Sequence, residues 1–342
     1  MAHFVLQIND WYRLNARSLP WRETKNPYFI WLSEVILQQT RVDQGLNYYL
    51  KFIHAFPTVE NLALADEEHV LKLWQGLGYY SRARNLHKTA KEVVERFNGE
   101  FPASYIDLLS LKGIGPYTAA AIASFAFDLQ HAVVDGNVYR VLSRYYGIDT
   151  PIDSTEGKKE FQSLASTLIP ADQPALFNQS IMEFGALFCT PANPNCEQCP
   201  LLDSCQSGSN QLYKQRPIKA KKTTVRDRYF HYFHIEFDQQ IAIHKRESKD
   251  VWQHLYEFPM IETTTAELLN TDLASLSIDS ARLNTQYTSK HILSHQRIHA
   301  IFYTLNETVL ADFQGLNTVS LSTLHDLPIH RLMHRYVEKY LS

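Results

Sequence analysis

The sequence predicts a multidomain protein in which an all-helical region is followed by a smaller α+β domain. Through the first two hundred residues, apolar positions recur at intervals of three, four and seven, the period of one helix face. From Tyr229 the pattern changes to alternation, and FHYFHIEFD and QQIAIHKRE predict two strands paired around a short turn. A Ser-, Gln- and Lys-rich segment lies between the two patterns. At 342 residues the chain is long enough for two or three domains.

The composition shifts give the domain boundaries. Residues 1–208 form the helical region, 209–228 a basic linker and 229–342 the α+β domain. The linker holds a run of basic residues against one acid, Asp227: Lys214, Arg216, Lys219, Lys221, Lys222, Arg226 and Arg228. Such a run is typical both of a solvated linker and of a nucleic-acid contact, and the net charge of −3 does not choose between them.

The overall composition is that of an ordinary globular protein, with 45% hydrophobic and 20% charged residues. No apolar run approaches the ~18 residues of a membrane span. The chain opens on an amphipathic segment with Asp10 and Arg13, and no signal peptide is visible. We therefore expect no membrane association and a reducing, cytoplasmic setting at the bacterial nucleoid, where thiols stay free.

Several helices are predicted inside the helical region. One apolar face runs through Leu32, Val35, Val42, Leu46, Tyr49 and Ile53, so that Gln38, Gln39 and Thr40 would continue the helix that carries Glu34. Further helices are expected from Ala65 or Asp66 to Gly76, over Tyr117–Phe127, and over Val138–Tyr146, where Gly147 is a C-terminal signal.

All four cysteines of the chain lie in one 17-residue loop, 189–205. They are spaced C-x6-C-x2-C-x5-C, at Cys189, Cys196, Cys199 and Cys205. Four thiolates in so short a loop suit either structural zinc or a cubane iron–sulfur cluster. Zinc sites usually show two C-x2–4-C pairs, and only one is present, so the spacing favours [4Fe–4S]. Two disulfides within one loop would staple little, and no flavin or nicotinamide motif accompanies the loop.

The segment LKGIGPYTAA places two glycines, Gly113 and Gly115, in a turn just before a helix. Glycine permits left-handed backbone there and lets N–H groups approach an anion at the helix N-terminus. This is the pattern of a helix-hairpin-helix clamp on the DNA backbone, over about 108–127. An ordinary joint between two helices also uses glycine.

Two carboxylic acids lie in unlike surroundings. Asp135, in VDGNVYRVL, precedes a helix whose N-terminus would keep it ionised, with Asn137 beside it; a plain helix cap is the simpler alternative. Glu34, in FIWLSEVIL, lies among apolar residues that would raise its pKa, unless it pairs with Arg41. One neutral and one ionised carboxyl group are the usual requirement for glycosidic cleavage through an oxocarbenium-like state.

Further polar and aromatic residues are candidates for holding an opened duplex. Gln39 and Thr40 follow Glu34, and Tyr79 follows the glycine pair Gly76/Gly78. Amides and aromatic rings on tight turns can wedge into a base stack. With 19 tyrosines in the chain, core packing is the alternative for the aromatic residue.

The tail contains three histidines at intervals of four: His291, His295 and His299. A helix would gather them for a metal, but SKHILSHQRIHAIFYTL predicts a loop that enters a strand over Ile298–Leu305. Ser294 and His295 are instead candidates for contacting a base edge. A closing helix is expected from Pro328.

Taken together, these motifs resemble the MutY-type adenine DNA glycosylases of the endonuclease III-like superfamily. The matching stretches, in the family's order, are SEVILQQTRV, WQGLGYYSRARNL, LKGIGPYTA, VDGNVYRVLSR, the four-cysteine spacing and WQHLYEFP. The resemblance covers nearly the whole chain and is most specific over residues 20–205. It implies a monomeric enzyme acting on double-stranded DNA that removes adenine mispaired with 8-oxoguanine or guanine.

The resemblance also implies roles for single residues. Glu34 would protonate adenine and Asp135 would stabilise the oxocarbenium ion, supported by Tyr117 and Asn137. Gln39 and Tyr79 would fill the gap in the stack. Lyase-competent relatives carry a Schiff-base lysine where this chain has Tyr117, so strand cleavage by that route is not expected.

The tail resembles the family's MutT-like domain, which recognises the oxidised guanine. The nucleotide-hydrolase box of related domains is absent between Met260 and Asn284, so nucleotide hydrolysis is not expected. The family's Phe-Ser-His loop is here Leu293-Ser294-His295, and leucine lacks the stacking surface of phenylalanine. The alternatives to this function are an endonuclease III-like enzyme for oxidised pyrimidines, a thymine glycosylase for G·T mismatches, a non-catalytic DNA-binding module and a redox carrier.

Overall fold

The computed structural model describes residues 1–208, 212–220, 224–274, 283–305 and 317–341. Its contacts divide the chain into two compact units. The first contains Met1–Leu64 and Lys88–Lys222, and the second contains Ala65–His87 and Thr223–Ser342. Lys221 and Lys222 of the basic run lie outside the described residues. No helix in the described ranges is long and apolar enough to cross a membrane.

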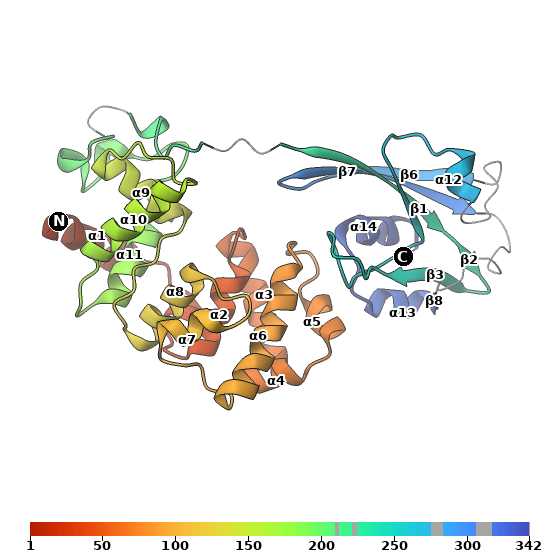
Figure 1. Cartoon of the computed structure of the whole chain (residues 1–342), viewed down its shortest axis with the longest axis horizontal. Coiled ribbons are helices and arrows are strands. Elements are labelled where there is room, and N and C mark those ends of the chain that lie inside the picture. The colour runs from red at the N-terminus through yellow and green to blue at the C-terminus, as the bar shows by residue number, and fades with distance from the viewer. Residues whose placement is uncertain (209–211, 221–223, 275–282, 306–316, 342) are drawn as a thin grey trace. The chain divides into compact units, whose positions relative to one another are not determined.

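The described part of the first two hundred residues is helical, as predicted, and the strands all come later in the chain (Figure 1). The helices of the first unit are α1 (Ala2–Asn15), α2 (Pro27–Ile36), α3 (Val42–Ala55), α4 (Val59–Leu64), α7 (Tyr105–Ser110), α8 (Pro116–Phe127), α9 (Gly136–Tyr146), α10 (Thr155–Leu168) and α11 (Pro174–Leu187). Helices α5 (Glu67–Leu73) and α6 (Ser81–Phe97) begin in the segment that belongs to the second unit.

Helix α11 is the centre of the first unit, since it packs on α1, α8 and α9. Its apolar side chains join a core that includes Phe4, Val138 and Phe177, each almost fully buried. Asn178, also fully buried, donates to Ser124 Oγ at 2.8 Å and accepts from the Val133 N–H at 3.1 Å. The extended stretch before Asp135 is thereby fixed against α8 and α11.

The prediction of one continuous helix through Gln38–Thr40 is wrong. Helix α2 ends at Ile36, and Gln39 has a left-handed backbone with φ of +55°. A turn closes there, with the Thr40 N–H donating to Leu37 O at 3.1 Å. The apolar period resumes in α3, which packs back against α2, so two helices with the same periodicity resemble one in the sequence.

The tail contains two small sheets. The first has strand order β5-β1-β7-β6, where β1 (Arg226–His234) runs parallel to β7 (Gln296–Leu305) and antiparallel to β5 (Met260–Thr263). Strand β6 (Leu283–Ile292) pairs with β7. The second sheet joins β2 (Glu236–Phe237), β3 (Gln240–Lys245), β4 (Tyr256–Glu257) and β8 (Asn317–Ser320). The remaining helices are α12 (Asn270–Ala274), α13 (Leu321–Asp326) and α14 (Arg331–Tyr340).

The predicted strand pair in the tail is only partly confirmed. β2 and β3 do form a hairpin, but just two residues of β2 pair, and β1 lies instead between β5 and β7. The loop expected before Ile298 is shorter than predicted, because 290–292 belong to β6. The closing helix begins three residues after Pro328, at Arg331, where His330 caps it. Tyr336 of this helix stacks on Phe302 of β7 with centroids 4.6 Å apart.

The segment Ala65–His87 is joined to the tail by polar contacts. Glu68 accepts from Lys245 Nζ at 2.7 Å and from Tyr256 Oη at 2.6 Å. Gln75 Oε1 accepts from the Ile329 N–H at 3.1 Å. On the other side of the Gly76–Tyr80 turn, Arg84 Nη1 donates to Gln253 O at 2.8 Å. Both flanks of this turn are therefore held by the tail.

Candidate active site

A cavity of about 650 Å³ opens in the first unit beside α2, α8 and the N-terminus of α9. The side chains and backbone that line it include the predicted residues Glu34, Gln39, Thr40, Gly113, Gly115, Tyr117, Asp135 and Asn137. Eight residues chosen from three separate stretches of sequence thus border one cavity. Tyr79, Ser294 and His295 belong to the second unit.

Glu34 lies on α2 with 8% of its surface exposed. Tyr117, at the start of α8, donates its phenolic hydrogen to Glu34 Oε2 at 2.6 Å. Burial raises the pKa of Glu34 to about 7, and the Tyr117 hydrogen bond acts in the opposite direction. A carboxylic acid of this kind carries a proton near neutral pH, as predicted from its apolar neighbours.

Asp135 caps the N-terminus of α9. Its Oδ1 accepts from the N–H groups of Asn137 at 2.9 Å and Val138 at 2.8 Å, and its Oδ2 accepts from Asn137 Nδ2 at 2.7 Å. Burial raises the pKa of Asp135, although these hydrogen bonds act to lower it. The predicted cap geometry is present, but the net direction of the pKa is upward rather than downward, because desolvation outweighs the cap.

The turn between α7 and α8 has the backbone that the glycine pattern predicts. Gly113 is left-handed, with φ of +83°, and Gly115 is the N-cap of α8. An added Cβ at Gly115 would meet nothing within 4 Å, so its backbone faces open space. Helix α8 begins at Pro116, which has no N–H, so the first N–H groups of the helix are those of Tyr117 and Thr118.

Arg140 is a residue of this site that the sequence analysis missed. Its guanidinium donates to Asn137 Oδ1 at 2.8 Å, to Gly185 O at 2.6 Å and to Cys189 O at 2.7 Å. It thus connects the amide beside Asp135 with the start of the cysteine loop. The only sequence signal was its position three residues after Asn137, on the same side of a helix.

Helix α11 packs closely against the start of α9, where Asn137 lies. An added Cβ at Gly185 would lie 2.7 Å from Asn137 Cβ, and Glu183 receives hydrogen bonds from Arg17 and Arg22. Burial alone would raise the pKa of Glu183, but the two guanidinium groups lower it to about 2. This buried ion network, also missed in the sequence, closes one wall of the cavity.

The four cysteines border one small, apolar cavity. Burial and, to a lesser extent, the neighbouring thiols raise the pKa of the Cys199 thiol to about 12. Arg144 Nη1 donates to Cys189 Sγ at 3.4 Å, and the Gly208 N–H donates to Cys205 Sγ at 3.4 Å. Among the described residues no three His, Cys, Asp or Glu side chains are placed to hold a metal ion. The four thiols, with these N–H···S donors, are the residues that could hold a metal centre.

Tyr79 lies in the second unit at the Gly76–Tyr80 turn. Its backbone is left-handed, with φ of +49°, and 44% of its surface is exposed. The Arg82 guanidinium lies over its ring at 5.8 Å and over the Trp74 ring at 5.1 Å. Trp74 Nε1 donates to Gly78 O at 3.0 Å, which fixes the turn. The strained backbone presents an aromatic ring to solvent.

The three tail histidines that are spaced by four residues do not form a common site. His291 lies on β6 against Trp252, and His299 on β7 contacts Asp227 Oδ1 at 2.7 Å. His295 and Ser294 are exposed in the turn that joins β6 to β7.

Comparisons with known proteins match both regions. The sequence model for HhH-GPD superfamily base excision DNA repair proteins matches residues 32–167, and that for a NUDIX domain matches residues 231–339. The adenine DNA glycosylase of Buchnera aphidicola subsp. Schizaphis graminum is 34% identical over 342 residues, covering 98% of each chain. The chain belongs to the adenine DNA glycosylases. It is accordingly a DNA glycosylase of base excision repair.

Other adenine DNA glycosylases match the helical region. The human protein is 44% identical over 220 residues, which is 62% of this chain and 40% of the human one. Among solved structures, a thermostable thymine-DNA glycosylase matches with a TM-score of 0.57 and 31% identity, covering 60% of this chain and 95% of its own. Endonuclease III trapped with DNA matches with a TM-score of 0.54 and 22% identity, which shows a common fold. The predicted fold class is confirmed.

Proposed function

We propose that this adenine DNA glycosylase removes adenine mispaired with 8-oxoguanine or guanine by hydrolysing the bond between the base and its sugar. The observation that carries the proposal is the pair of carboxyl groups in one cavity, Glu34 and Asp135. The first is buried, with a pKa of about 7, and the second accepts three hydrogen bonds at a helix N-terminus. Groups so different in surroundings suit an acid and a carboxylate.

We propose the position of the transferable proton from the hydrogen bond that Glu34 receives. Tyr117 donates to Glu34 Oε2, so the transferable proton is on Oε1. Glu34 gives this proton to the adenine, the C1′–N9 bond breaks, and its electron pair leaves with the base. Asp135 stabilises the cationic sugar that remains, and Asn137 holds Asp135 in place. Water then adds at C1′, and its proton returns to Glu34.

Because Tyr117 has no amine, it cannot form an imine with the sugar, so we propose that the enzyme is monofunctional and leaves the DNA strand intact. The Gly113–Gly115 turn and the N–H groups of the first turn of α8 would hold a backbone phosphate. Gln39 and Tyr79, both with left-handed backbones, would enter the stack where adenine has left, and Thr40, next to Gln39 in the chain, would contact the DNA there.

We further propose that Ser294 and His295 read the base opposite adenine, because both are exposed in one turn between two strands. The four cysteines would hold a [4Fe–4S] cluster, which would fix the loop that Arg140 and Arg144 join to α9. The protein would act as a monomer on duplex DNA in the bacterial cytoplasm. The domain boundaries after 208 and before 229 remain predictions.

One assay on the full chain tests the function. Purified protein is incubated with duplexes containing A·8-oxoguanine, A·G, A·C, G·T or thymine glycol, with and without alkali. We expect cleavage only after alkali and only in the adenine-containing strand. Excision of thymine, or strand cleavage without alkali, would contradict the proposal.

Single substitutions test the roles of the two acids. Asp135→Asn and Glu34→Gln should each slow single-turnover excision by about 10²–10⁴-fold, because both groups act on the transition state. Duplex binding should stay within about tenfold. Asp172→Asn and Glu156→Gln remove exposed carboxylates of the same unit and serve as controls. A rate within a few-fold of the wild type would remove that residue from the mechanism.

A further inference from the structure

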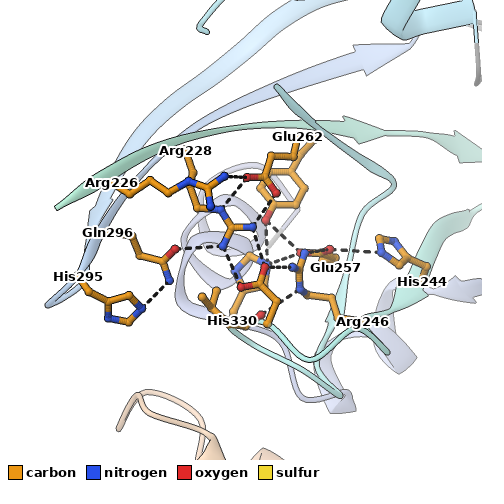
Figure 2. Close-up of polar contacts among 12 residues, drawn as sticks. Arg226, Arg228, His244, Arg246, Glu257, Glu262, His295, Gln296 and His330 are labelled. Atoms are coloured by element: carbon orange, nitrogen blue, oxygen red, sulfur yellow. Dashed lines mark hydrogen bonds and ion pairs between the residues drawn. The ribbon is translucent and has the colours of Figure 1, made fainter. Parts of the chain in front are cut away.

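The turn between β6 and β7 combines two exposed side chains with a buried one. Ser294 and His295 are exposed, whereas the next residue, Gln296, keeps only 5% of its surface accessible. The Leu293 N–H donates to Gln296 O at 2.8 Å and closes the turn. The amide of Gln296 contacts His295 on one side and the buried Arg228 on the other (Figure 2).

Arg228 decides which way the amide faces. A guanidinium only donates hydrogen bonds, and Arg228 Nη1 lies 3.0 Å from Gln296 Oε1. The amide oxygen must therefore face Arg228, and its NH₂ group must face the turn. There Nε2 of Gln296 lies 3.2 Å from Nε2 of His295.

Arg228 is itself held in place by two carboxylates. Its Nε and Nη2 donate to Glu262 at 2.7 and 2.6 Å (Figure 2). Its Nη1 and Nη2 donate to Asp250 at 2.9 and 2.7 Å. Its guanidinium also lies 4.7 Å from the centre of the Phe230 ring. The two bidentate ion pairs hold the buried Arg228 side chain in a single conformation, and this fixes the orientation of the Gln296 amide as well.

The orientation of the amide has a consequence for His295. An NH₂ group only donates, so His295 Nε2 must accept and cannot carry the proton of the neutral ring. That proton is then on Nδ1, which lies 3.2 Å from Ser294 Oγ. The serine oxygen accepts it, and the serine keeps its own hydrogen for a partner outside the turn.

We infer that Gln296 is a positioning residue that fixes the tautomer of His295 and, through it, directs the Ser294 hydroxyl hydrogen toward the DNA. Without the amide donor, His295 could place its proton on Nε2, and Nδ1 would accept the serine hydrogen instead. The hydroxyl would then have nothing to donate to a base. This inference rests on the proposed reading of the opposite base by Ser294 and His295.

Gln296→Glu tests the inference with the full chain, because a carboxylate is nearly isosteric with the amide but accepts where the amide donates. In protein labelled with ¹⁵N-histidine, long-range ¹H–¹⁵N spectra distinguish the two tautomers, and a His295→Asn variant assigns the signals. We expect the Nδ1–H form in the wild type and a proton on Nε2 in Gln296→Glu. Gln296→Met, which removes the donor without adding charge, should give both forms. Gln286→Glu makes the same change at an exposed position of β6 and should leave the wild-type form.

Binding to A·8-oxoguanine and A·G duplexes is measured on the same proteins. Loss of one directed base contact should lower the preference of Gln296→Glu for the lesion by roughly tenfold. Adding Gln296→Glu to a Ser294→Ala/His295→Ala background should change nothing further. His295 remaining in the Nδ1–H form in Gln296→Glu would overturn the inference, as would a changed tautomer with full discrimination. A wild type that binds both duplexes equally would refute the proposed reading of the base, and the nitrogen spectra would still decide the role of Gln296.

Discussion

Tyr117→Phe should extend activity to higher pH. The phenol donates a 2.6 Å hydrogen bond to the buried Glu34, and this bond favours the ionised form of the acid. Without this hydrogen bond, less opposes the effect of burial, so the pKa of Glu34 rises. In the proposed mechanism Glu34 acts in its protonated form, so a higher pKa should keep the enzyme active at a pH where Glu34 of the wild type has lost its proton.

The size of the shift follows from the strength of the bond. A hydrogen bond to a charged group contributes about 1.5–3 kcal/mol, and one pKa unit corresponds to about 1.36 kcal/mol. The pKa of Glu34 should therefore rise from about 7 by roughly one to two units. Below pH 6 both proteins carry the proton, so the variant should lose only the rate that depends on the orientation of Glu34.

Single-turnover excision of adenine between pH 5 and pH 10 measures the effect, with alkali treatment to reveal abasic sites. Tyr28→Phe is the matched control. Tyr28 lies on α2, as Glu34 does, but its hydroxyl donates at 2.7 Å to the Phe56 carbonyl instead of to Glu34. Its alkaline limit should match the wild type. An alkaline limit of Tyr117→Phe that stays at the wild-type pH, or moves to lower pH, would refute the assignment of Glu34 as the proton donor.

Four other predictions concern stability, the cluster and the tail. Glu34→Gln should gain stability over the wild type, by roughly 3 kcal/mol, as the pH rises from about 4.5 to 7, because over that range the unfolded wild type loses the Glu34 proton that the folded protein still holds; urea unfolding at pH 4.5 and pH 8 checks this. Glu183→Gln should cost ~3–5 kcal/mol at pH 7, since it leaves two guanidinium groups without their carboxylate; the same unfolding assay would show no change if the network were dispensable. Cys199→Ser should lose the brown colour and DNA affinity, or fail to fold, and metal analysis that finds one zinc and no iron in the wild type would contradict the cluster. Ser294→Ala with His295→Ala should reduce the preference for A·8-oxoguanine over A·G at least tenfold, by loss of base contacts of ~1–3 kcal/mol each; full discrimination in binding assays would place recognition elsewhere.

Local features of the site could be predicted from the sequence because they depend on neighbouring residues. The burial of Glu34 follows from the apolar residues around it, and the cap at Asp135 follows from the helix that starts after it. The contact between Glu34 and Tyr117 joins residues 83 positions apart, and no periodicity contains it. The same holds for Arg140, whose bond to Cys189 O depends on how α9 and α11 pack.

The errors in the predicted fold also arise because tertiary packing is not recorded in the local sequence pattern. Gln39 was expected on a helix because a tight turn between two helices can keep the apolar phase. Strand β1 was expected to pair with its neighbour in sequence, but its near-continuous burial suits a central strand, and its parallel partner β7 begins at Gln296. Pairing over such a separation is decided by tertiary packing, which alternation in the sequence does not record.

The contacts of Ala65–His87 bear on the design of truncated and chimeric forms of this enzyme. The segment precedes much of the helical region in the chain, yet Glu68, Gln75 and Arg84 find hydrogen-bond partners in the tail. A fragment that ends in the linker would keep every residue of the helical region. It would lose these hydrogen bonds to the tail, which lie on both flanks of Tyr79. Under the proposed function, poor discrimination by such a fragment would thus have two origins: the missing turn with Ser294 and His295, and a less firmly held Tyr79. Exchanging tails between relatives would preserve function only if residues 65–87, which contact the tail, were exchanged together with it.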